Sequence, residues 1–254
     1  MSIVQIVFSP TGGTQKVADI ITDEWGMPVE KTDLSDARAD FSAVQLNKED
    51  IAVIALPSFG GRVPALATQR LEKIQGNQAL CVLVCVYGNR AYEDTLIEMK
   101  DTAEQCGFRV AAGVAAIAEH SIMHQYATGR PDAADQKELK EFADKILDKI
   151  RNSASVSTPD IPGNHPYKKS GGAGLVPKAD NNCIGCGLCA RNCPAGAISE
   201  ENPKITDSKK CISCTRCVTQ CPQSARKVNS VMVAAAALAI KKACSVRKNN
   251  ELYL

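Results

Sequence analysis

Two cysteine runs near the end of the 254-residue chain restrict its possible folds more than any other feature. The runs are CIGCGLCARNCP at 183–194 and CISCTRCVTQCP at 211–222, and both read C-x2-C-x2-C-x3-C-P. Each cysteine of the first run has its counterpart 28 positions later, so the segment is a duplicated unit. Because cysteines in a reducing compartment rarely form disulfides, this clustering indicates metal ligation.

The spacing within each run suits an iron–sulfur cluster better than a zinc ion. A cubane 4Fe-4S cluster needs one thiolate per iron, and three cysteines two residues apart can wrap a tight loop around three of its corners. Gly185 and Gly187 allow such a loop to turn closely, and the proline after the fourth cysteine directs the chain away. Zinc also accepts four cysteines, but zinc sites usually pair two distant C-x2-C motifs without a central third cysteine.

Residues 178–228 resemble the bacterial-type ferredoxins that carry two 4Fe-4S clusters. In that family the fourth cysteine of each run ligates the other cluster. The resemblance therefore implies two interleaved ligand sets, which are Cys183, Cys186, Cys189 and Cys221 for one cluster and Cys193, Cys211, Cys214 and Cys217 for the second.

The first 151 residues show a different pattern, in which apolar strands alternate with amphipathic helices. Nearly continuous apolar runs predict strands at 2–8, 50–56, 79–87 and 108–118, with a weaker candidate at 28–34. Helical spacing begins at Thr14 and recurs at 91–106 and 135–151. This alternation predicts an α/β fold, a doubly wound parallel sheet of five strands covered on both faces.

The loop SPTGGT, residues 9–14, follows the first predicted strand and precedes the first predicted helix. It offers three hydroxyls, two glycines and the N–H groups of a helix start, which together can bind a phosphate. The loop is neither a Walker loop nor a G-x-G-x-x-G motif. The alternative is a capping turn without a ligand.

This loop resembles the T-G-x-T phosphate loop of flavodoxins, and residues 1–151 resemble the flavodoxin-like fold. Flavodoxins bind FMN with three loops, so the resemblance implies an FMN site here. Its phosphate would lie on Ser9, Thr11, Gly12, Gly13 and Thr14. The isoalloxazine ring would be flanked by Pro57, Ser58, Phe59, Gly60, Gly61 and Arg62 and by Tyr87, Gly88, Asn89, Arg90 and Tyr92. Typical flavodoxins are acidic near the ring, whereas Arg62 is expected to place a positive charge at its N1/O2 edge.

The whole chain resembles the fused flavodoxin–ferredoxin proteins of anaerobes, the EFR-type ferredoxins, on the motifs GGRVP, VYGNRAYED and EHS. The expected organisation is an FMN-binding domain at 1–151, a linker rich in Ser, Pro and Gly at 152–177, a ferredoxin domain at 178–228 and a C-terminal helix and tail at 229–254. The apolar helix at 229–244 is expected to dock on the body of the protein. An interfacial membrane anchor is the alternative, disfavoured because the polar face holds few basic residues.

A flavin exchanges electrons singly or in pairs, whereas each cluster passes one. The expected function is therefore electron transfer between FMN and two 4Fe-4S clusters, linking one-electron and two-electron redox partners, either proteins or small molecules. The alternatives are a flavin-dependent reductase of a small acceptor, with His120 or Tyr92 lining its pocket, and a docking scaffold with an empty flavodoxin-like domain. A homo-oligomer is a further possibility that the sequence leaves open.

Charge and hydropathy favour a cytoplasmic protein without nucleic-acid partners. The net charge is +2, which gives no bulk attraction to nucleic acid. The apolar stretch at 231–240 has ten residues, short of the roughly 20 that span a membrane, and no secretory signal is visible at the start. Five cations make the ferredoxin region basic and would either steer an acidic redox partner or form a solvated face. They are Lys209, Lys210, Arg216, Arg226 and Lys227.

Overall fold

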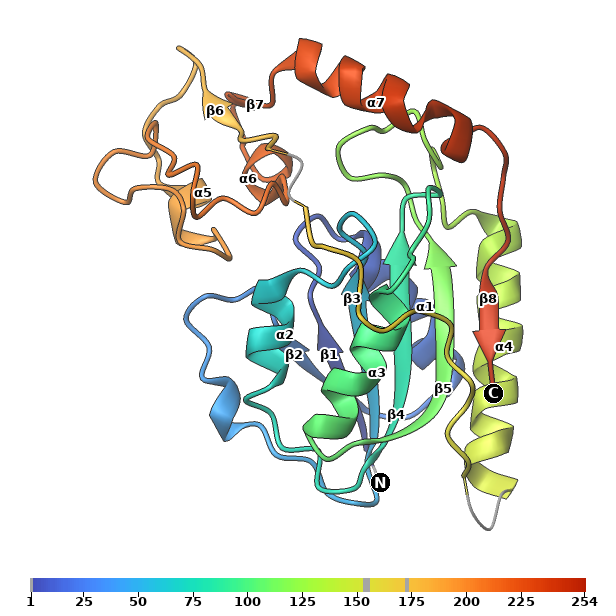
Figure 1. Ribbon diagram of the computed structural model, residues 1–254. Helices are drawn as coiled ribbons and strands as arrows, with labels where there is room; N and C mark the ends of the chain where they lie inside the picture. Colours follow the sequence, from blue (N-terminus) through green and yellow to red (C-terminus); the bar gives the residue numbers. More distant parts are fainter. Residues whose placement is uncertain (1, 153–155, 172–173) are drawn as a thin grey trace.

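The computed structural model describes residues 2–152, 156–171 and 174–254. Its centre is a sheet with the strand order β2-β1-β3-β4-β5-β8 (Figure 1). The first five strands run parallel to one another, as the sequence predicts. They are β1 (Ile3–Val7), β2 (Val29–Asp33), β3 (Ile51–Pro57), β4 (Leu80–Tyr87) and β5 (Arg109–Ile117).

Helices cover both faces of this sheet because the central strands are apolar on both sides. On one face, α1 (Gly13–Glu24) and α4 (Ala133–Asn152) pack against one set of alternating strand residues. On the other face, α2 (Ala65–Leu71) and α3 (Thr95–Gln105) pack against the other set. A short 3₁₀ turn at Phe41–Ala43 buries its phenylalanine in the second of these cores.

The order β2-β1-β3-β4-β5 is the flavodoxin-like winding of a doubly wound fold. In this winding the order in which successive strands join the sheet reverses between β1 and β3, which opens a crevice at the carboxyl ends of the strands. The loops at 9–14, 57–64, 87–94 and 118–132 all begin at this edge of the sheet. The fold therefore gathers the predicted FMN loops at one edge.

The C-terminal tail adds a sixth strand that the sequence did not predict. Strand β8 (Glu251–Tyr253) pairs antiparallel with β5, Gly113 opposite Tyr253 and Ala115 opposite Glu251. Three residues are too few to show a periodic pattern, so only the fold identifies this strand. The last residues of the segment expected as a C-terminal helix and tail thus belong to the sheet of the first domain.

The cysteine-rich segment forms a small domain beside the carboxyl edge of the sheet (Figure 1). It contains the short strands β6 (Lys178–Ala179) and β7 (Arg226–Lys227), which pair antiparallel, and the single-turn helices α5 (Leu188–Arg191) and α6 (Arg216–Thr219). Helix α7 (Ser230–Cys244) then crosses above the sheet edge and leads to β8.

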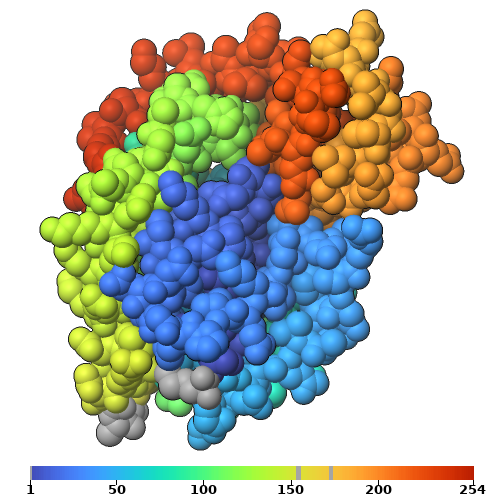
Figure 2. All heavy atoms as spheres, turned by 180° about the vertical axis from the view of Figure 1, so that it is seen from behind, coloured from blue at the N-terminus to red at the C-terminus, as the bar shows by residue number. Residues whose placement is uncertain are grey.

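Helix α7 docks on the loop that follows β5, as the sequence analysis favoured. Ala237 is buried against Met123 and Leu175, and the hydroxyl of Tyr126 donates a 2.7 Å hydrogen bond to the carbonyl of Ala237. Viewed from behind, the loop after β5 in green lies directly under this helix in red (Figure 2).

The described part of the expected linker is packed along the first domain. Ile161 is buried in the core beside α3. Further along, the carboxylate of Asp94 accepts hydrogen bonds from the backbone of Asn164 at 3.0 Å and of Lys168 at 2.7 Å. The Ser, Pro and Gly content of the segment does not indicate these contacts. Burial of Ile161 and the hydrogen bonds to Asp94 hold the segment on the first domain.

Candidate functional site

The first predicted loop, residues 9–14, has the backbone of an anion site at the start of α1. Gly12 adopts a left-handed conformation with φ of 93°, and no side chain caps the helix at that position. A side chain on Gly13 would meet Ala118 at 3.5 Å, so the loop lies against the end of β5. The N–H groups of Gly13 and Thr14 in the first helical turn are therefore available to an anion, and the helix dipole favours one.

One hydroxyl of this loop has a structural partner. The Oγ of Ser9 accepts a 2.9 Å hydrogen bond from the backbone of Gln15, and the backbone N–H of Ser9 donates to Ser35 at 3.0 Å. Ser9 thus acts partly as a capping residue, which was the alternative reading of the loop. Thr14 is buried and Thr11 is half-buried beside it.

The second loop, residues 57–64, is a tight reversal. Phe59 and Arg62 exchange two backbone hydrogen bonds across Gly60 and Gly61. Both glycines have positive φ, 63° and 88°, which this two-residue turn requires. Before the turn, Pro57 ends β3, and the Ser58 hydroxyl accepts a 2.8 Å hydrogen bond from Thr95.

The guanidinium of Arg62 is held on the side of α3 and the linker. It forms a two-point ion pair with Glu98, at 2.7 and 2.8 Å, and stacks over the ring of Tyr167 with its carbon 4.6 Å from the ring centre. Its remaining nitrogen donates to the carbonyl of Lys168 at 2.5 Å. These partners differ from the flavin edge that the sequence suggested, and a role of Arg62 at a flavin remains a prediction.

The third loop, residues 87–92, is tied to the C-terminal segment. The buried amide of Asn89 donates to the carbonyls of Cys244 at 3.0 Å and Val246 at 2.9 Å. The hydroxyl of Tyr92 bonds to Tyr253 at 2.7 Å, and Arg90 pairs with Glu93 at 3.0 Å.

These contacts change what the third loop offers to a ligand. The polar ends of Asn89, Arg90 and Tyr92 already have protein partners in this structure: Asn89 and Tyr92 bond to the C-terminal segment, residues 244–253, and Arg90 bonds to Glu93. Tyr87 is buried, and a side chain on Gly88 would collide with His120. Direct flavin contacts of these five residues remain predictions.

His120 lies where β4 and β5 end, packed against Gly88. Its Nδ1 accepts hydrogen bonds from the backbone N–H groups of Ile122 and Met123, both at 3.2 Å. Burial lowers the pKa of the imidazole below its ordinary value. The ring is therefore neutral at physiological pH and carries its proton on Nε2.

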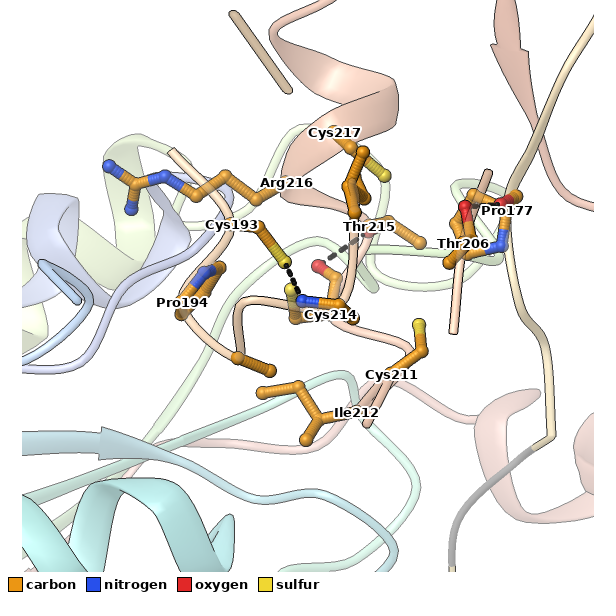
Figure 3. A pocket seen from close by; sticks show the side chains of 13 residues that line it. Pro177, Cys193, Pro194, Thr206, Cys211, Ile212, Cys214, Thr215, Arg216 and Cys217 are labelled. Carbon is orange, nitrogen blue, oxygen red and sulfur yellow. Dashed lines mark hydrogen bonds between the residues drawn. The ribbon is translucent and has the colours of Figure 1, made fainter. Parts of the chain in front are cut away.

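The eight clustered cysteines line two cavities of similar size. We call the first the inner cavity; it is lined by Cys193, Cys211, Cys214 and Cys217 (Figure 3). We call the other the outer cavity; it is lined by Cys183, Cys186, Cys189 and Cys221. The empty space is about 360 Å³ in the inner cavity and about 350 Å³ in the outer, including the part open to solvent. The two groups of cysteines are those that the resemblance to ferredoxins implies as ligand sets, and their binding of clusters remains a prediction.

The two cysteine loops share one backbone despite different residues. Gly185 and Gly187 have φ of 70° and 73°, and their counterparts Ser213 and Thr215 have φ of 55° and 59°. A threonine in this left-handed region is strained, which is typical of functional sites. The loop geometry therefore follows from the site rather than from the glycines alone.

The fourth cysteine of each run accepts a backbone hydrogen bond at its sulfur. The N–H of Ala197 donates to Cys193 and the N–H of Ala225 to Cys221, both at 3.3 Å. Although burial opposes it, such donors hold the pKa of Cys221 below its ordinary value. Burial raises the pKa of Cys214 to about 11.

The inner cavity contacts the flavodoxin-like domain directly. Arg70, on α2 and 9% exposed, donates to the carbonyl of Leu34 after β2 and to that of Pro194 beside Cys193, both at 2.6 Å. Ile212 packs against the core of the sheet, and the hydroxyl of Thr215 donates to the carbonyl of Ser121 at 3.3 Å.

A cation of the ferredoxin domain also reaches the first domain. Arg216 lies 3.8 Å from the carboxylate of Asp33 at the end of β2, and Figure 3 shows its side chain extending away from the cysteines. The outer cavity differs, because Cys186 is exposed and Ile184 is 67% exposed. One cavity thus faces the sheet edge and the other faces solvent.

The expected basic surface is smaller than the sequence suggested. Arg226 is fully buried and Arg216 is turned toward Asp33, while Lys227 pairs with Asp180 at 2.7 Å. Only Lys209 and Lys210 remain as exposed charges of that group without an ion pair among the described residues. A general electrostatic attraction for acidic partners is therefore weak.

Sequence reasoning missed two site residues with a clear structural role, Arg70 and Asp94. Arg70 stands in the helix α2, which the sequence analysis did not predict, and nothing in the local pattern marks it. Asp94 follows the third loop and could have been noticed as an acidic residue at a strand end.

The strand order and the two cysteine cavities define the class of the chain: a flavodoxin-like α/β domain fused to a ferredoxin-type 4Fe-4S domain. In agreement, residues 182–226 match the family described as the 4Fe-4S dicluster domain. Comparison with curated protein sequences gives no significant match.

Solved structures resemble the first domain. The flavodoxin of Streptococcus pneumoniae TIGR4 is 21% identical, with 58% of this chain and 99% of that chain covered and a TM-score of 0.43. The Megasphaera elsdenii flavodoxin is 20% identical, with 56% and 98% covered and a TM-score of 0.36. Rubredoxin oxygen:oxidoreductase of Desulfovibrio gigas is 16% identical, with 59% and 36% covered and a TM-score of 0.43. Such likenesses carry no ligand over to this chain.

Among the helices within the described ranges, none combines the length and the apolarity that a membrane crossing needs.

Proposed function

We propose that this protein is an iron–sulfur flavoprotein that transfers electrons between FMN and two 4Fe-4S clusters. The observation that carries the proposal is the contact between the inner cavity and the carboxyl edge of the sheet. Arg70 and Thr215 form hydrogen bonds across this contact, and the first loop begins at the same edge. The arrangement would bring a cluster and a flavin close together.

The residues present fit two cubane clusters. Four cysteines line each cavity, whereas no three His, Cys, Asp or Glu side chains of the described chain gather tightly enough for a single metal ion. The wider spacing supports cubanes over zinc, which needs ligands about 2.3 Å from one centre. The buried Nε of Arg226 also lacks a hydrogen-bond acceptor, as expected beside an anionic cluster.

The first loop fits the phosphate of FMN. Gly12 has open space around its missing side chain, and the N–H groups of Gly13 and Thr14 at the start of α1 stay available, since Ser9 caps only that of Gln15. The isoalloxazine ring is proposed to lie between the second and third loops. There the chain would contact it through backbone and through Phe59 and Tyr87, since the polar side chains of both loops hold other partners.

A bound flavin supplies the ability to exchange electrons singly or in pairs, which the clusters lack. The residues of the chain set the order of the route. Arg70 fixes the Cys193 loop against the first domain, so the cluster in the inner cavity is proposed to exchange electrons with the flavin. Because Cys186 is exposed, the cluster in the outer cavity is proposed to exchange electrons with a partner.

The partner at the outer cavity is proposed to be a one-electron redox protein or a small one-electron carrier. Ile184, 67% exposed beside Cys183, offers an apolar contact there. A cytoplasmic location, the absence of nucleic-acid partners and a possible homo-oligomer remain part of the proposal from the sequence.

Anaerobic purification with iron, sulfide and flavin quantified tests this function. Two clusters and one flavin require about eight iron, eight sulfide and one FMN per chain. A preparation with clusters and without flavin, even after addition of FMN, would favour the docking scaffold instead. One metal ion per cavity without sulfide would contradict the clusters.

A further inference from the structure

Arg226 is a buried cation without an acidic partner. Its side chain is 2% exposed, and its guanidinium donates to the Thr206 hydroxyl at 2.7 Å, to the Pro177 carbonyl at 3.3 Å and to the Pro203 carbonyl. The ion pairs of the ferredoxin domain join Arg216 to Asp33 and Lys227 to Asp180, and none within the described ranges includes Arg226.

A charge in this position needs compensation. Removing a guanidinium from water is costly unless an opposite charge lies nearby. Neutral carbonyl acceptors compensate only part of this lost hydration. The Nε of Arg226 is buried and has no acceptor among the described atoms. A protein therefore keeps such a residue where an anion is bound.

The guanidinium lies between the two cavities. Arg226 and Pro203 line the outer cavity, whereas Thr206 and Pro177, which accept its hydrogen bonds, line the inner cavity. A 4Fe-4S cluster with four thiolate ligands is anionic and becomes more so on reduction. The missing negative charge is thus expected on both sides of this side chain.

The internal duplication provides a natural comparison. The residue 28 positions before Arg226 is Ile198, which follows Cys193-Pro194 as Arg226 follows Cys221-Pro222. Ile198 is 5% exposed and lines the inner cavity. The fold therefore accepts an aliphatic residue at this position, and the arginine is not needed to shape the loop.

We propose that Arg226 is the buried counter-ion of the two clusters, and that it raises the reduction potential of both, most strongly in the outer cavity whose wall it forms. This inference rests on the proposed function, since it requires that the clusters bind. A bound cluster would take one electron from an external donor, and the positive charge of Arg226 would stabilise the reduced, more negative state by direct attraction.

The test is a redox titration of the anaerobically purified holoprotein with dithionite, followed by electron paramagnetic resonance of the reduced clusters. Arg226→Gln retains a hydrogen-bond donor and removes the charge, whereas Arg226→Lys retains the charge. The glutamine variant is expected to shift the reduced-to-oxidised ratio of the outer cluster at least tenfold toward oxidised, about 59 mV for a one-electron couple. The inner cluster is expected to shift less in the same direction.

Ile198→Met is the matched control, because it changes the equivalent wall of the inner cavity without changing charge, and its potentials should equal those of the unmodified protein. Wild-type potentials in Arg226→Gln, with clusters assembled, would overturn the inference. If Gln loses the clusters and Lys keeps them, the charge is required for assembly, which supports it. If both lose them equally, the role is packing and the inference fails. Absence of clusters from the unmodified protein would instead contradict the proposed function.

Discussion

The inner and outer cavities come from one duplicated sequence, yet their surroundings differ. Both are lined by four cysteines with the same spacing. The inner one is held against the sheet edge by Arg70 and Ile212, whereas the outer one exposes Cys186 and Ile184. The two cavities therefore share their cysteine spacing and differ in packing, which supports the proposal that a cluster in the inner cavity would lie nearer the flavin and one in the outer cavity nearer a partner.

The largest expected effect comes from the fourth cysteines, because each belongs to one run and lines the cavity of the other. Cys193→Ser should remove the inner cluster and Cys221→Ser the outer, each variant losing about half of the iron. Flavin reduction by a one-electron donor should stop in Cys193→Ser and continue in Cys221→Ser with a small donor. Iron analysis and stopped-flow absorbance measure both effects.

Cys106→Ser is the control, since Cys106 lies outside both cavities. If Cys193→Ser eliminated the signal of the outer cluster and spared the inner one, the interleaved ligand sets would be wrong.

A smaller effect is expected from the arginine that joins the domains. Arg70→Met leaves the carbonyls of Leu34 and Pro194 without their donor. Each buried acceptor left unpaired costs about 1–3 kcal/mol, so the inner cavity should detach more often from the sheet edge. Flavin reduction should slow several-fold while iron content stays unchanged.

Arg38→Met is the matched control for Arg70, because Arg38 is exposed and its side chain contacts neither cavity. Equal rates of flavin reduction in both variants would show that the Arg70 contact has no part in electron transfer.

The first loop should affect the flavin and neither cavity. Thr11→Val removes a hydroxyl beside the proposed phosphate and should weaken FMN binding about tenfold, equivalent to about 1.4 kcal/mol. Thr11→Ser keeps the hydroxyl and should bind FMN nearly as the unmodified protein does. Fluorescence titration of the flavin-depleted protein measures this, and unchanged affinity in the valine variant would exclude Thr11 from the phosphate site.

The smallest effect concerns the linker that connects the two regions. The backbone N–H of Lys168 is the main cause that lowers the pKa of Asp94 below its ordinary value. A lowered pKa means that this carboxylate stabilises the folded state above its unfolded pKa of about 3.9 and loses that effect only as the pH falls below it. Proteolysis within residues 156–171 should therefore be equally slow from pH 5 to 8.

Asp94→Asn should accelerate that cleavage about fivefold at every pH in this range, as the loss of about 1 kcal/mol implies. Cleavage of the unmodified protein that rises between pH 7 and 5.5 would contradict this account, because the Asp94 carboxylate stays ionised over that range.

Much of this organisation follows from sequence patterns that repeat. Four of the five parallel strands are visible as apolar runs and β2 only as a weaker candidate, while the ligand sets are implied by the resemblance of the cysteine runs to ferredoxins. Strand β8, Arg70 and the packing of the linker were not predictable, because each depends on residues distant in sequence. Gln, Asn and Arg side chains can bond to many backbone carbonyls. The sequence therefore does not show that Asn89 binds the C-terminal segment rather than a flavin.

Arg226 lies between these cases. The duplication placed it opposite Ile198, so the sequence already showed a cation where the first repeat has an aliphatic residue. Only the structure shows that its charge is buried between the cavities. Positions at which two internal repeats carry different residues, such as Ile198 and Arg226, thus indicate where two otherwise equivalent sites differ.

The most direct measurement of the central proposition is stopped-flow mixing of the fully loaded protein with a one-electron donor under anaerobic conditions, with clusters and flavin followed at separate wavelengths. The proposed route predicts that the clusters are reduced first and that flavin reduction follows at a rate independent of donor concentration. Transfer through the inner cluster would be contradicted if the flavin were reduced at the same rate in the unmodified protein and in Cys193→Ser, with a rate proportional to donor concentration.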